Sequence, residues 1–185
     1  MALALTSLAG RKPTVLALAG LPGAGKSTLA QALSTITAWP VIDRDRIRAE
    51  AWPEDASAAA RQAADRLLLR RVGSGVRAGL SLIVDGKSYA SAEDRALLSA
   101  EVDEADAELQ WIWLDLGIEQ ACARIAAQSG HPAPDRDAKL VVKVAQRFAP
   151  LSGSAWHLDA SRPAAELADE VVALLARRLQ ALIIE

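Results

Sequence analysis

The stretch TVLALAGLPGAGKSTLA, residues 14–30, decides the fold of this chain. Within it, Gly20 is followed after four residues by Gly25-Lys26-Ser27, which satisfies the phosphate-binding pattern G-x-x-x-x-G-K-[ST] in full. The apolar run 15–19 predicts a buried strand before the loop, and residues 26–35 predict a helix after it. In such a unit the glycines let backbone N–H groups face a phosphate, and the helix N-terminus adds partial positive charge. We therefore expect the chain to bind a nucleoside triphosphate.

The loop and the first helical turn supply the expected nucleotide contacts. Lys26 is predicted to reach the β- and γ-phosphates and to act in catalysis, and the Ser27 hydroxyl is predicted to ligate Mg²⁺. The alternative, a chance glycine-rich turn before an amphipathic helix, does not account for the full motif in its expected context. The predicted nucleotide-binding residues are Gly20, Leu21, Pro22, Gly23, Ala24, Gly25, Lys26, Ser27 and Thr28.

Length and composition are those of an ordinary globular protein. We expect the 185 residues to form a single domain, with residues 1–12 as an N-terminal extension that lacks the charge order of a secretory signal. A formal charge of −2 disfavours a dedicated nucleic-acid surface, and no apolar run approaches the roughly 18 residues of a membrane span. The single cysteine, Cys122, permits no internal disulfide, so a cytoplasmic location is expected.

Strand and helix patterns alternate along the whole chain. Strands are predicted at 15–19, 39–43, 82–85, 109–115 and 155–158, and helices at 26–35, briefly from 47, and at 57–77, 91–103, 118–127, 137–148 and 163–184. This alternation predicts an α/β fold with a parallel sheet, helices on both faces and ligands beyond the carboxyl ends of the strands. The stretch 129–137, rich in Gly, Pro and polar residues, is predicted to be a lid loop.

Two carboxylates lie at the ends of predicted strands. Asp85 ends an apolar strand and is predicted to hold Mg²⁺, although a turn or helix-capping role is the simpler alternative. Asp45 follows the second strand and could accept the proton of a substrate hydroxyl. The arginines around it, at 44, 46 and 48, could grip an anionic substrate, or the group could be a solvated salt-bridge cluster.

Further candidates surround these acids. Arg124 and Arg136 flank or occupy the lid loop, where an arginine could stabilise the transferring phosphoryl group; exposed helix charges are the alternative. The segment 159–161 falls where an adenine ring would lie, or is an ordinary turn. Trp39 and Trp52 bracket the Asp45 cluster, and one of them could line an acceptor pocket.

Three motifs, GLPGAGKSTLA, VIDRDRIR and LIVDG, together resemble the small P-loop kinases of the adenylate-kinase-like group. The resemblance covers roughly residues 14–165. It is closest to the branch with the kinase domain of polynucleotide kinase, chloramphenicol phosphotransferase, gluconate kinase and zeta toxins. It implies a three-layer P-loop NTPase fold with a five-stranded sheet in the order 2-3-1-4-5 and a small lid.

The same resemblance implies roles for particular residues. Asp45 corresponds to the general base, Arg48 to an arginine that supports the acceptor or the reacting phosphate, and the lid maps onto residues 124–136. The chain departs from this branch in two places. Gln128 stands where a second lid arginine is often found, and Lys87 follows Asp85 and Gly86, where it could contact an anionic acceptor.

The sequence thus predicts an ATP- and Mg²⁺-dependent phosphotransferase that moves the γ-phosphoryl group to a hydroxyl of a small molecule. A nucleic-acid 5′-hydroxyl is a second candidate acceptor, disfavoured by the mildly acidic composition. A nucleotide-dependent switch without an acceptor is a third reading, against which the general-base candidate Asp45 argues. No motif specifies the acceptor, a preference for ATP over GTP, or an oligomeric state; residues 49–80 are expected to shape the acceptor pocket.

Overall fold

The structure, a computed structural model, describes residues 11–55, 57–127, 137–151 and 153–184. Its strands are β1 (Thr14–Gly20), β2 (Val41–Asp43), β3 (Leu82–Asp85), β4 (Glu108–Asp115) and β5 (Trp156–Asp159). Its helices are α1 (Lys26–Thr37), α2 (Arg44–Ala51), α3 (Ala58–Arg77), α4 (Ala92–Glu104), α5 (Ile118–Ala127), α6 (Ala138–Gln146) and α7 (Ala164–Ile184).

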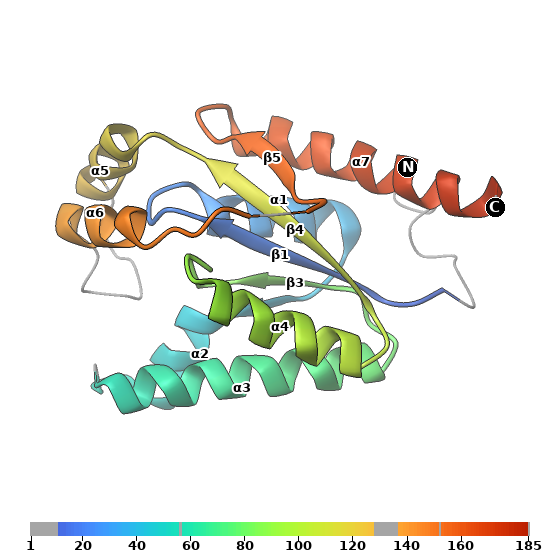
Figure 1. The fold of residues 1–185 in the computed structure, drawn as a ribbon, viewed down its shortest axis with the longest axis horizontal. Coiled ribbons are helices and arrows are strands. Elements are labelled where there is room, and N and C mark those ends of the chain that lie inside the picture. The colour runs from blue at the N-terminus through green and yellow to red at the C-terminus, as the bar shows by residue number, and fades with distance from the viewer. Residues whose placement is uncertain (1–10, 56, 128–136, 152, 185) are drawn as a thin grey trace.

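The five strands form one sheet in the order β2-β3-β1-β4-β5, and all neighbouring strands are parallel. Helices α1 and α7 pack on one face, and α2, α3 and α4 pack on the other, so the fold has three layers (Figure 1). Helices α5 and α6 lie together at the end of the molecule toward which β1 and β4 run. The predicted fold class, sheet order and three-layer arrangement are confirmed.

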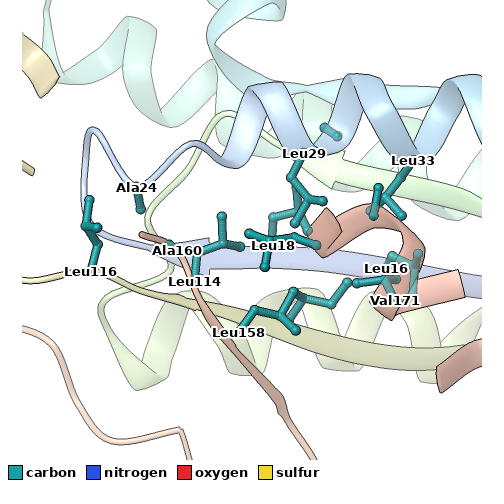
Figure 2. Packing of buried hydrophobic residues seen from close by; sticks show 14 of the residues in the cluster. Leu16, Leu18, Ala24, Leu29, Leu33, Leu114, Leu116, Leu158, Ala160 and Val171 are labelled. Atoms are coloured by element: carbon teal, nitrogen blue, oxygen red, sulfur yellow. The ribbon is translucent and has the colours of Figure 1, made fainter. Parts of the chain in front are cut away.

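The central strand β1 is buried on both faces. Leu16 and Leu18 belong to the cluster under α1 and α7, whereas Val15 and Ala17 belong to the cluster under α3 and α4. Figure 2 shows the two leucines among side chains of α1 and neighbouring strands. Burial of each leucine contributes about 1.5–3 kcal/mol. A strand enclosed in this way is apolar at every position, and it fixes where the phosphate loop begins.

The segment around β2 differs most from the sequence-based prediction. The strand begins at Val41, not at 39, and the following helix begins at Arg44, not at 47. The Asp43 carboxylate caps this helix, because its Oδ1 accepts hydrogen bonds from the backbone N–H of Asp45 (2.8 Å) and Arg46 (3.3 Å). Asp45 therefore lies in the first turn of α2, held by a helix and not by a loop.

Some predictions fall outside the described residues. Residues 1–10 and 128–136 are not described, so the N-terminal extension, the lid loop 129–137 and the division into a single domain stay predictions. Arg136 and Gln128 belong to this part of the chain. Among the described helices, none combines the length and apolar character needed to cross a membrane.

Candidate active site at the carboxyl edge of the sheet

The phosphate loop depends on glycine at two close approaches. Gly20 (φ +148°) and Gly23 (φ +85°) adopt backbone conformations that side chains disfavour. A Cβ at Gly20 would lie 2.7 Å from the Leu114 carbonyl oxygen, and one at Gly23 would lie 2.6 Å from that of Ala121. Strand β4 and helix α5 thus press on the loop from one side and hold its shape.

Lys26 closes the loop on itself. Its side chain is buried, and its Nζ donates hydrogen bonds of 2.9 Å to the carbonyl oxygens of both Gly20 and Leu21. The next residues, Ser27 and Thr28, are exposed at the start of α1. Helix α1 thus presents its N-terminal N–H groups and a fixed ammonium group at one point, as binding of a polyphosphate requires.

A cavity of about 580 Å³ lies beside the loop. Its walls come from the phosphate loop, the first turns of α2 and α3, the end of β3 and one side of α6. The structure brings five of the predicted catalytic and metal-binding residues to this one cavity: Lys26, Ser27, Asp45, Arg48 and Asp85. Of the loop residues, Pro22, Gly23, Gly25 and Thr28 also line it.

Asp85 is the most deeply buried carboxylate of the cavity, with 1% of its surface exposed. Within the described part of the chain, its Oδ1 atom has no hydrogen-bond partner. A buried carboxylate oxygen without a protein donor can be satisfied by water or by a cation, and the Ser27 residue lines the same cavity. Oxygen ligands of these two kinds, completed by phosphate oxygens and water, suit Mg²⁺. The residues present therefore fit the predicted metal.

Asp43 is a second, partly buried carboxylate next to Asp85. Strand register places it beside Asp85. Burial first, and then the charge of Asp85, raise the pKa of the Asp43 carboxyl, while its hydrogen bonds from the backbone of Arg46 and Asp45 oppose this shift. Asp43 thus caps α2 next to a second carboxylate, and a cation bound at Asp85 would relieve the repulsion between them.

Asp45 is fixed by a chain of ion pairs. Its Oδ1 lies 3.1 Å from Nη1 of Arg44, whose Nε donates to Asp65 of α3 (2.9 Å). The other oxygen of Asp65 accepts from Lys87 (2.9 Å), which also donates to Asp94 of α4 (2.8 Å). Elements α2, α3 and α4 are therefore tied together behind the predicted general base.

This chain changes the interpretation of Lys87. The residue lines the cavity, but two of its three donors are used by Asp65 and Asp94. Although burial raises it, the pKa of Asp94 is lowered overall by its hydrogen bond with Lys87 and the charge of that residue, with a smaller contribution from Arg147. Lys87 therefore mainly links α3 and α4 in the cavity wall, and only one of its three N–H groups remains for a substrate.

The predicted lid arginines lie elsewhere or outside the described residues. Arg124 does not line the cavity. Its Nη2 donates weakly to the Ser161 carbonyl oxygen (3.5 Å), and its Nη1 would lie 3.9 Å from a Cβ at Gly25. It therefore stands between the phosphate loop and the segment 159–161, where an adenine ring was expected. Arg136 is not described, so both lid roles stay predictions.

Neither tryptophan near Asp45 lines the cavity. Trp39 packs against the cluster under α1, and Trp52 packs against the cluster under α3 and α4. The pocket role considered for them is wrong. Trp111, on β4, makes an edge-to-face contact with the buried Tyr89, at 5.0 Å between ring centroids. These large rings stabilise the core and leave the cavity polar.

Sequence reasoning missed one wall of the cavity. Residues at positions i, i+3, i+4 and i+7 along α6 and its C-cap face the cavity: Leu140, Lys143, Val144 and Arg147. This spacing is that of one helical face. The spacing was visible in the sequence, but nothing in the sequence indicated that this face turns toward the ends of the strands.

Gly86 can be used to test how closely the start of α2 packs against the turn after β3. A Cβ there would lie against Asp43 Oδ1 and 2.5 Å from the Arg44 nitrogen, and its φ is +86°. Gly86→Ala is expected to lower the free energy of unfolding by about 2–4 kcal/mol through strain and overpacking. Gly79, with φ +81° and nothing within 4 Å, is the matched control. Equal losses for the two alanine variants in urea unfolding would contradict the tight seating of α2.

The chain was compared with models of known protein families and with curated proteins. The family model described as AAA domain matches residues 15–151. A search of curated proteins gives no significant match.

Several solved structures are similar over nearly the whole chain. A gluconokinase from Sinorhizobium meliloti 1021 is 21% identical, with a TM-score of 0.66, covering 94% of this chain and 98% of that one. APS kinase from Mycobacterium tuberculosis, in complex with AMPPNP and APS, is 20% identical, with a TM-score of 0.68 and coverage of 89% and 98%. Shikimate kinase from Acinetobacter baumannii, in complex with shikimate, is 16% identical, with a TM-score of 0.65 and coverage of 96% and 98%.

At these identities the similarity establishes the fold, and the resemblance to small P-loop kinases is confirmed at that level. The family match is more direct, because it covers well over half of the chain. The chain therefore belongs to the AAA domain family and has the fold of the small P-loop kinases.

Proposed function

We propose that the protein is an ATP-dependent phosphotransferase that moves the γ-phosphoryl group to a hydroxyl of a small-molecule acceptor. One observation carries the proposal: the phosphate loop, the buried Asp85 and the helix-held Asp45 all line a single cavity. A nucleotide switch needs the first two groups, but it has no use for a fixed carboxylate on the acceptor side of the cavity.

The transfer follows from these positions. The acceptor oxygen attacks the γ-phosphorus while its proton passes to a carboxylate oxygen of Asp45. A new O–P bond forms, the bond from the γ-phosphorus to the β,γ-bridging oxygen breaks, and ADP leaves. Lys26 and the loop N–H groups bind the phosphates, and Arg48 faces the reacting groups from α2. Mg²⁺, held by Ser27 and Asp85, would supply positive charge that offsets the charge of the phosphates.

The similar solved structures support a small acceptor and ATP as donor. They are a gluconokinase, an APS kinase in complex with AMPPNP and APS, and a shikimate kinase in complex with shikimate. AMPPNP is an ATP analogue. The net charge of −2 continues to disfavour a nucleic-acid acceptor. A cytoplasmic location, where ATP is available, remains part of the proposal.

A screen for acceptor-stimulated ADP release tests the function. The purified protein is incubated with Mg²⁺ and ATP or GTP, alone and with pools of hydroxyl-bearing metabolites or 5′-hydroxyl oligonucleotides. We expect ADP release that rises with one metabolite class and yields a phosphorylated product in mass spectrometry. Stimulation by the oligonucleotides alone would favour the nucleic-acid reading, and nucleotide-dependent partner binding without any stimulation would favour a switch.

A further inference from the structure

The cavity carries far more positive than negative charge. Among the described residues, seven cationic side chains and two carboxylates line it; the cations are Lys26, Arg44, Arg48, Arg61, Lys87, Lys143 and Arg147, and the carboxylates are Asp45 and Asp85. A Mg²⁺-bound nucleoside triphosphate brings only about two net negative charges. The walls therefore hold more positive charge than the donor neutralises.

Part of the surplus is neutralised within the wall. Arg44 is paired with Asp45 and Asp65, and Lys87 is paired with Asp65 and Asp94. Lys26 is fixed at the phosphate loop. These three cations are thus accounted for by the fold and the donor, and the cations considered next lie on α2 and α6.

Arg48 is the clearest case. Only 7% of its surface is exposed, and it lines the cavity from the second turn of α2. Within the described residues, its guanidinium group has no carboxylate or carbonyl partner. Because none of its nitrogen atoms is both buried and unpartnered, the guanidinium group opens into the cavity, where an anion can bind it in fork geometry. The position favours an anionic ligand opposite Arg48.

Helix α6 and its C-cap supply two more cationic side chains to the cavity. Lys143 and Arg147 line the cavity one turn apart, and neither forms a salt bridge in the described part of the chain, although the charge of Arg147 helps to lower the pKa of Asp94. The segment after α6 is tied to the start of α4, because the N–H of Ala149 donates to the Ala90 carbonyl (2.9 Å) and Arg95 donates to that of Pro150 (3.1 Å). This anchoring puts Arg147 near Asp94 and Lys87 at the start of α4.

We propose that the acceptor is an organic anion, whose carboxylate or phosphate group is bound by Arg48 of α2 together with Arg147 of α6. The inference rests on the proposed phosphotransferase function and adds the charge class of the substrate. The same group would fix the distance from the reacting hydroxyl to Asp45, so that only hydroxyls at the right spacing from the charge are phosphorylated.

Anion binding to the donor-filled protein tests this proposal. The protein is first saturated with Mg²⁺ and AMPPNP, which occupies the donor site including its γ-phosphate position. Inorganic phosphate and, separately, acetate are then titrated by calorimetry. We expect one ion to bind per chain with a dissociation constant in the millimolar range, and the tighter of the two ions identifies a phosphate or a carboxylate group.

Variants locate the bound ion. Arg48→Met and Arg147→Met are each expected to weaken ion binding by at least tenfold. Arg147 is exposed, so its variant carries the test even if Arg48→Met fails to fold. The matched controls, Arg66→Met on α3 and Lys139→Met on α6, remove exposed cations that do not line the cavity and should leave ion binding unchanged.

The two proposals can fail separately. Loss of AMPPNP binding itself would count against the phosphotransferase function. Normal AMPPNP binding without any ion binding, or ion binding equally strong in Arg48→Met, Arg147→Met and the unchanged protein, would overturn the anionic acceptor alone. So would efficient turnover of a neutral acceptor whose kcat/KM does not change in either variant.

Discussion

Asp45→Asn is expected to lower turnover of the true acceptor by about 10²–10⁴-fold while the affinity for MgATP is retained. Asparagine has the same shape, but its amide cannot take the hydroxyl proton. Nucleotide binding should persist, because the phosphate loop and Lys26 are unaffected. Rapid-quench measurement of the chemical step, beside calorimetric titration with MgAMPPNP, separates the two quantities.

The control for this variant is Asp103→Asn, which removes an exposed carboxylate of α4 that does not line the cavity. It should turn over at the unchanged rate. The alternative role for Asp45 is its salt bridge with Arg44, whose Nη1 lies 3.1 Å from the Asp45 carboxylate. If Asp45→Asn phosphorylates the acceptor at the normal rate, Asp45 is a salt-bridge residue and another base acts.

Lys26→Met is the second substitution with a large expected effect. We expect kcat to fall by about 10²–10³-fold, because a fixed positive charge beside the transferring group is lost. Nucleotide affinity should also fall, since the ammonium group is expected to contact the phosphates. Methionine keeps the length and apolar stem of lysine, so the fold should persist even though the hydrogen bonds to Gly20 and Leu21 disappear. Fluorescent-nucleotide binding and single-turnover rates measure both effects.

Lys139→Met, on the outer side of α6, controls for the loss of one lysine. Thermal unfolding of both variants shows whether the Lys26 site has collapsed. A folded Lys26→Met protein with normal affinity and rate would place the phosphates away from this loop and would undermine the whole assignment.

The fold was predictable because its strongest signals are local. The run from Val15 to Ala19, the glycine loop and the following helix are contiguous, and a strand buried on both faces is apolar throughout. Repeated strand–helix alternation then leaves few topologies for a parallel sheet. Asp85 and Asp45 could be predicted to lie at the carboxyl edge of the sheet, because Asp85 ends β3 and Asp45 comes two residues after the end of β2.

The start of α2 was predicted less well. The charged run after β2 offered no apolar periodicity, so a helix was expected only from Ile47. The contact that starts this helix at Arg44 is the N-cap made by the Asp43 side chain. Asp43 is also the last residue of β2, so the sequence pattern marked it only as a strand residue. Local sequence therefore underestimated how rigidly Asp45 is held.

The wall formed by α6 was not predictable for a different reason. Its orientation depends on contacts between residues far apart in the sequence, such as Ala149 with Ala90. Trp39 and Trp52, one of which could have lined an acceptor pocket, instead pack partly buried against the two core clusters. Side chains near a site in sequence do not necessarily face it.

The close contacts at Gly20 and Gly23 bear on how this protein can diverge. The proposed donor half combines main-chain groups of the loop with the side chains of Lys26 and Ser27, and a side chain added at Gly20 or Gly23 would collide with β4 or α5. The proposed acceptor half consists of side chains from α2, α3 and α6, where the exposed Lys143 and Arg147 can be exchanged without moving the backbone. Under the proposed function, new acceptors would be acquired by a few substitutions on α6, while the nucleotide-binding loop stays unchanged.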